Sequence, residues 1–124
     1  DGEQTRSFLF IDECIEANWR LMQSDFKGPV NIGSEEMVTI NQLVDTAAKV
    51  SGKTVGKNHI DGPLGVRGRN SNNDLIRKEL GWDYTQTLEE GIRKTYNWIS
   101  QQICKETITS ATLKNVEYDL LASG

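Results

Sequence analysis

The sequence predicts a small α/β fold in which a short, few-stranded sheet is combined with about four helices. Short β-branched and aromatic segments alternate along the chain with segments whose apolar residues recur every three or four positions. Turn and capping residues separate the two kinds of segment. The expected order is strand, helix, strand, helix, strand, loop, helix, helix, and such a sheet would leave one face to be covered.

Three strands are expected. TRSFLF (5–10) is β-branched and aromatic, GPVNIGS (28–34) is a short apolar run between turn residues, and VGKNHI (55–60) follows the same pattern. We therefore interpret the single histidine, His59, as an ordinary strand residue. After the first strand, apolar residues change to helical spacing and share one face of a helix: Ile11, Cys14, Ile15, Trp19 and Met22.

Capping residues set the ends of the other helices. Thr39 begins and Gly52 ends the second helix. Asn72 or Asn73 caps a short helix at 74–80, which Gly81 ends. Thr87 and Glu90 have the spacing of a capping box at the start of the longest helix, which is expected to extend to about residue 106.

Composition excludes several classes of function. The net charge of −4 argues against a nucleic-acid binder, and the chain contains no apolar run of the length that spans a membrane. The segment DGEQTRSF is too polar for a signal peptide, so we expect a cytoplasmic protein. Cys14 and Cys104 fall on apolar helix stripes and are interpreted as small buried residues, although a disulfide stays possible. His59 has no companions at ligand spacing, so no metal site is expected.

The chain lacks the common catalytic motifs but contains a candidate anion site. It has no G-x-S-x-G, no phosphate loop, no dinucleotide fingerprint and no Tyr-x-x-x-Lys pair, so no catalytic or cofactor-binding residue is assigned. Arg6 lies in the first strand, and Arg67 and Arg69 lie in the glycine-rich loop at 62–74. Guanidinium forks and a nearby helix start would suit a diphosphate. The alternative is that the loop arginines are solvated or paired with acidic groups.

Several motifs together resemble the extended short-chain dehydrogenase/reductase enzymes that act on sugar nucleotides, and within them the GDP-mannose 3,5-epimerase type. These motifs are DG-x-QTRSF, the IDEC that follows it, PVNIGS, GPLGVRGRNS and TYNWISQQICKE. The resemblance implies that residues 1–106 form the carboxy-terminal nucleotide-sugar-binding lobe of a Rossmann-type enzyme. Residues 107–124 form a tail that does not match the family and whose structure is not predicted.

The resemblance also implies roles for individual residues. Gln4, Thr5, Arg6 and Arg69 would contact the substrate, with Arg6 and Arg69 on the diphosphate of a GDP-sugar, and Arg67 would have a structural or rim role. NAD would be bound by a domain outside this chain and none by the chain itself. The parent would be an NAD-dependent epimerase, whereas the chain alone would be inactive.

Two alternatives remain open: a lobe of another NAD-dependent nucleotide-sugar epimerase or dehydratase, and a stand-alone binding or interaction module. Because a Rossmann partner domain would be missing from this lobe, we expect the sheet and the first helix to present apolar area that a complete enzyme buries. This area would favour homo-oligomers formed through the exposed surface.

Overall fold

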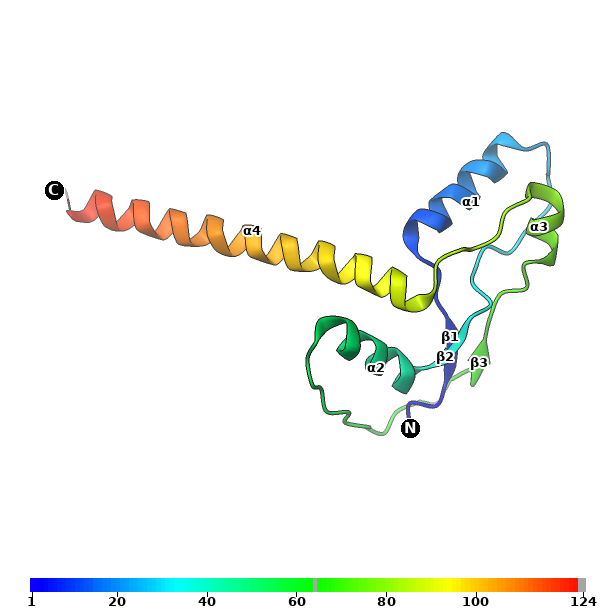
Figure 1. Ribbon diagram of the computed structural model, residues 1–124, viewed down its shortest axis with the longest axis horizontal. Helices are drawn as coiled ribbons and strands as arrows, with labels where there is room; N and C mark the ends of the chain where they lie inside the picture. Colours follow the sequence, from blue (N-terminus) through cyan, green and yellow to red (C-terminus); the bar gives the residue numbers. More distant parts are fainter. Residues whose placement is uncertain (64, 123–124) are drawn as a thin grey trace. The chain divides into compact units, whose positions relative to one another are not determined.

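The computed structural model describes the backbone of residues 1–63 and 65–122 and the side chains of residues 1–63 and 65–105. Its elements are β1 (Thr5–Ser7), α1 (Ile11–Gln23), β2 (Met37–Thr39), α2 (Ile40–Ser51), β3 (Gly68–Arg69), α3 (Asp74–Leu80) and α4 (Leu88–Ala122) (Figure 1). The α/β class, with a few-stranded sheet and four helices, is confirmed. The chain divides into two compact units, Asp1–Arg93 and the part that begins at Lys94.

The sheet has the order β2-β1-β3. The central strand β1 pairs antiparallel with β2, where Arg6 lies opposite Val38, and parallel with β3, where Arg6 lies opposite Arg69. A Cβ on Gly68 would lie only 2.7 Å from the Thr5 hydroxyl, so β3 can approach β1 closely because this position is glycine. The sheet therefore places a residue of the glycine-rich loop beside the first strand.

Two of the predicted strands are wrong. Residues 28–34 and 55–60 have no regular structure, so His59 is not a strand residue, and β2 and β3 lie at 37–39 and 68–69 instead. Val30 and Ile32 pack against the core, but their segment is not a strand because no described strand lies beside it to form backbone hydrogen bonds. The first strand was placed correctly but covers only residues 5–7 of the expected 5–10.

The predicted helices are confirmed, and their ends follow local capping chemistry. Thr39 and Gln42 form a capping box on α2, and Gly52 ends that helix with a φ of 67°. Gly81 ends α3 in the same left-handed conformation, with a φ of 58°. At the start of α4, Glu90 accepts a hydrogen bond from the Thr87 backbone N–H at 2.8 Å. The helical backbone of α4 continues past the expected end near 106 to Ala122.

A small core lies between α1, α3 and the segment after α3. Ala17, Ile76 and Trp82 are its buried residues, and Leu9, Val30, Ile32, Leu80 and Tyr84 pack against them. The buried carboxylate of Glu13 joins α1 to the chain before α4, because its Oε1 accepts hydrogen bonds from the Thr85 and Gln86 N–H groups at 2.6 and 3.1 Å. These contacts position the segments around the site described below.

The apolar stripe of α1 points away from this core. Ile11, Ile15, Trp19 and Met22 are 59–75% exposed, whereas Glu13 and Ala17 form the buried face of the helix. This agrees with the expectation that the first helix presents apolar area. Cys14 is half-buried, but Cys104 is exposed, which contradicts the predicted burial of Cys104, and both thiols are free.

Within the part of the chain that the structure describes, membrane-spanning helices and metal-binding clusters are both absent. There, no helix is both long and apolar enough to cross a bilayer. In the same part of the chain, no three His, Cys, Asp or Glu side chains gather in a way that could hold a metal ion.

Candidate functional site

The site is built around two arginines on neighbouring strands. Arg6 of β1 and Arg69 of β3 are register partners in the parallel pair, so both side chains start from the same face of the sheet. Like charges at directly opposed sheet positions are normally unfavourable. An arrangement of this kind becomes favourable when an anion lies between the two guanidinium groups.

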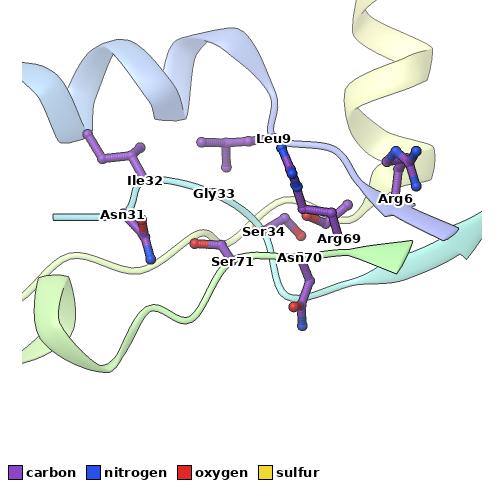
Figure 2. Close-up of a pocket in the computed structure, with 10 residues that line it drawn as sticks. Arg6, Leu9, Asn31, Ile32, Gly33, Ser34, Arg69, Asn70 and Ser71 are labelled. Carbon is purple, nitrogen blue, oxygen red and sulfur yellow. The ribbon is translucent and has the colours of Figure 1, made fainter. Parts of the chain in front are cut away.

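Both arginines line one cavity of about 360 Å³ (Figure 2). Its other lining residues are uncharged: two are apolar, Leu9 and Ile32, and the rest are small or hydrogen-bonding, namely Ser7, Asn31, Gly33, Ser34, Asn70 and Ser71. Its walls come from β1 and the residues after it, from segment 31–34, and from β3 with the residues after it. Two cations, neutral donors and no carboxylate make this lining suitable for an anion with hydroxyl groups.

The two guanidinium groups differ in their partners. Arg6 donates to the backbone carbonyl oxygens of Thr5 at 2.7 Å and Val66 at 2.8 Å, so its fork is held at the sheet. The side chain of Arg69 makes no hydrogen bond or ion pair with any residue that the structure describes. Arg69 therefore has its donors available to a ligand.

The helix start expected to assist the arginines does not do so. The Asn73 N–H donates to Glu35 Oε1 at 3.0 Å, and the Asp74 N–H donates to Asn72 Oδ1 at 3.0 Å. These N–H groups at the start of α3 are therefore used within the protein. The candidate anion site therefore consists of the two arginines and the neutral wall residues.

A network of polar side chains lies behind the walls. The buried side chain of Asn73 donates to the Gly33 carbonyl oxygen at 2.8 Å and accepts from the Ser71 hydroxyl at 2.7 Å. Arg77 holds Glu35 with two hydrogen bonds, at 2.6 and 3.1 Å, and also donates to Asp83 at 2.8 Å. Hydrogen bonds from Arg77 lower the pKa of the Glu35 and Asp83 carboxyl groups, and these carboxylates in turn raise the pKa of Arg77.

The other predicted site residues lie around the cavity rather than in its lining. The backbone oxygen of Gln4 accepts a hydrogen bond from the Ile40 N–H at 3.1 Å, and Thr5 is the register partner of Gly68 in the β1–β3 pair. Arg67 forms an exposed ion pair with Asp1 at 2.9 Å. The structure thus brings Arg6 and Arg69 together, while Gln4 and Thr5 support the strands that carry them.

Sequence reasoning did not identify the neutral residues of the cavity. Asn31 and Ser34 lie in the segment that was taken for a buried strand, and Asn70 and Ser71 follow Arg69 directly. The run NIGS and the run RNSNN both place small polar residues next to a glycine or an arginine. This pattern is a signal for a polar wall, but only the fold shows that the two runs face the same cavity.

Comparisons with known proteins identify relatives of the chain. No protein-family model matches it. It is 55% identical over 106 residues to GDP-mannose 3,5-epimerase of Arabidopsis thaliana, which covers 86% of this chain and 28% of that protein. It is 32% identical over 92 residues to UDP-glucuronic acid decarboxylase 6 of the same plant, covering 73% and 27%. The chain thus spans little more than a quarter of the curated relatives that it matches.

Solved structures give the same result for the fold. UDP-glucose 4-epimerase from Thermotoga maritima, solved with UDP-glucose, matches with a TM-score of 0.78 at 26% identity, covering 83% of this chain and 34% of that one. UDP-glucuronic acid 4-epimerase from Bacillus cereus, solved with NAD, matches with a TM-score of 0.71 at 27% identity. The match covers 82% of this chain and 33% of that one. The resemblance inferred from the sequence motifs is confirmed by these similarities.

Proposed function

We infer that this chain, a homologue of the GDP-mannose 3,5-epimerases among the extended short-chain dehydrogenase/reductase enzymes, binds the diphosphate of a nucleotide sugar between Arg6 and Arg69. The observation that carries this proposal is the pairing of the two arginines in register on one cavity without a carboxylate in its lining. Two guanidinium forks can each hold two phosphate oxygens. The neutral wall residues would then form hydrogen bonds with the hydroxyl groups of the ligand, both as donors and as acceptors.

The relatives support a diphosphate more directly than a particular sugar or base. The names of the matched proteins include GDP-mannose, UDP-glucuronic acid and UDP-glucose. These compounds differ in base and sugar but share the diphosphate. A GDP-mannose type of substrate is favoured for this chain because its identity to that epimerase, 55%, exceeds its 32% identity to the decarboxylase.

The role of the chain in a parent enzyme would be to bind and orient the substrate. Binding energy that holds a substrate in one geometry contributes to catalysis without bond-making groups. NAD is present in several of the structural neighbours, and in a parent enzyme it would carry hydride chemistry. This chain has no glycine-rich dinucleotide motif of the strand–loop–helix type, so we assign that cofactor to the rest of the parent.

A second candidate is a lobe of another nucleotide-sugar enzyme, which the similarity to the decarboxylase supports. A titration with GDP-mannose and UDP-glucuronic acid, followed by NMR of the labelled chain, compares the two. Tighter binding of GDP-mannose supports the first candidate, and tighter binding of the uridine compound supports the second. Absence of binding by both would favour an interaction module.

The site itself is tested with matched arginine variants. We expect Arg69→Ala to weaken binding of the preferred nucleotide sugar about ten- to hundredfold, since a charge-assisted contact contributes about 1.5–3 kcal/mol. Arg67→Ala removes the same charge from the same loop, but its partner is Asp1, so its loss should be smaller. Equal losses would refute the division of roles, and unchanged binding in Arg69→Ala would remove the site assignment.

A further inference from the structure

The polar network behind the cavity connects two of its walls. Asn73 is fully buried and contacts both walls, through the Gly33 carbonyl oxygen at 2.8 Å and the Ser71 hydroxyl at 2.7 Å. Its backbone N–H is fixed by Glu35 Oε1 at 3.0 Å. Glu35 is held in turn by the Arg77 fork. A continuous chain of hydrogen bonds therefore extends from Arg77 to the cavity lining.

We propose that Arg77 is a positioning residue of the anion site, which holds the wall at 31–34 closed against the wall at 69–71. This proposal rests on the proposed function, because it concerns the same cavity. Arg77 does not line the cavity and acts through Glu35 and Asn73. The four residues Glu35, Asn73, Arg77 and Asp83 are called the wall bracket below.

An arginine is suited to this position by the geometry of its fork. Its NH1 and NH2 bind Glu35 at 3.1 and 2.6 Å, while its Nε binds Asp83 at 2.8 Å. One planar guanidinium thus fixes two carboxylates: Glu35, which follows the wall at 31–34, and Asp83, which follows α3. A lysine ammonium is a single point of charge and cannot hold both carboxylates in this fixed plane. The lowered pKa values of Glu35 and Asp83 agree with an intact bracket at neutral pH.

The expected effect of the bracket depends on the size of the anion. A small anion can lie against one guanidinium whatever the width of the cavity. A diphosphate must span from one arginine toward the other and the wall, so it requires the walls at their set distance. Loss of the bracket should therefore reduce the preference for a long anion more than the binding of a short one.

Two inorganic probes measure this preference in the 124-residue chain. NMR titrations with orthophosphate and pyrophosphate give two dissociation constants, and their ratio is the selectivity for the longer anion. We expect Arg77→Gln to lower this ratio at least about threefold, and Arg77→Lys to give an intermediate value, since single lost contacts commonly change affinity by such factors. Arg93→Gln is the matched control, because Arg93 pairs with Glu89 at 2.7 Å and lines no part of the cavity.

The ratio separates positioning from loss of fold. Partial unfolding lowers the apparent affinity for both probes equally and leaves the ratio unchanged, so a normal ratio in both Arg77 variants would overturn the proposal. If Arg77→Gln does not fold, Arg77→Lys decides alone. If the unchanged chain shows no preference for pyrophosphate, or if Arg69→Ala keeps that preference, the proposed function fails first. If those two tests succeed and the Arg77 variants keep the normal selectivity for pyrophosphate over orthophosphate, only the positioning role of Arg77 is refuted.

Discussion

The substitution Gly33→Ala tests how closely the two cavity walls must approach. A Cβ at this position would lie 2.6 Å from the Cβ of Ser71 and 3.0 Å from its hydroxyl oxygen. Carbon atoms in favourable contact are about 3.5–4.0 Å apart, so the walls would have to separate by about 1 Å. The obstructing atom is the first carbon of a side chain and cannot rotate away. Overpacking of this kind typically costs about 1–3 kcal/mol.

Urea unfolding measures this cost. The buried Trp82 supplies the fluorescence signal, and a loss of about 1–3 kcal/mol should move the midpoint down by about 1 M for a chain of this size. Gly56→Ala is the matched control, because a Cβ at Gly56 would meet nothing within 4 Å. We expect the midpoint of that control to stay near the unchanged value.

A second substitution identifies the cause of the loss. Ser71→Gly removes the atom that a new Cβ would meet, so the double variant Gly33→Ala/Ser71→Gly should recover at least about 1 kcal/mol relative to the sum of the single variants. The single variant Ser71→Gly is needed because it also loses the hydrogen bond to Asn73. Simple additivity of the two changes, or a Gly33→Ala midpoint equal to that of the control, would refute the contact between the walls.

Two further predictions concern acid stability and self-association. Arg77 lowers the pKa of the Glu35 and Asp83 carboxyl groups, and Lys49 lowers the pKa of Glu89. A carboxyl group whose pKa is lowered by folding stabilises the fold at pH values above its unfolded pKa, which is near 4.5 for glutamate. This stabilisation is lost as the pH falls through the lower pKa of the folded state. Urea unfolding measured from about pH 7 to about pH 3 should therefore show a free energy of unfolding that falls below about pH 4.5. The fall should be less steep in Arg77→Gln than in the unchanged chain, and an equal slope in both would contradict the role of Arg77. The exposed stripe of α1 should cause concentration-dependent association in sedimentation experiments, and Trp19→Lys should reduce it because a charge replaces apolar contact, whereas Thr54→Lys on an exposed loop should not. A monomer at high concentration in the unchanged chain would disprove this.

Local chemistry made the helices predictable. The caps at Thr39, Gly52, Gly81 and Thr87 each depend on residues within one turn, so the sequence alone contains the whole interaction. The extent of α4 beyond residue 106 was not predicted, because the mixed composition of residues 107–122 was not assigned to any element, although this segment contains neither the glycine nor the proline that would end a helix.

The strands could not be predicted in the same way, because a strand needs a partner that is distant in sequence. Residues 28–34 and 55–60 have suitable composition but no paired neighbour in the described sheet. Gly68 and Arg69 have poor strand composition, yet they pair with β1. For the candidate site, arginine chemistry predicted Arg6 and Arg69, which the structure places on one cavity. The neutral wall and the wall bracket depend instead on contacts between residues about 40 positions apart, such as Asn73 with Gly33.

The pairing of β3 explains why the cations of the glycine-rich loop can form a site. Thr5 N–H donates to the Arg67 carbonyl oxygen at 2.9 Å, and this bond sets the register that places Arg69 beside Arg6. Side chains alternate between the two faces of a strand, so a slip of one residue would move Arg69 to the opposite face. Gly68 permits the close approach to Thr5 that keeps the register, and the Asp1–Arg67 ion pair lies at the same end of the strand. Gly68 and Arg67 therefore support the position of Arg69. As a result, the glycine-rich loop presents one available guanidinium, that of Arg69, and the other arginine is paired with Asp1.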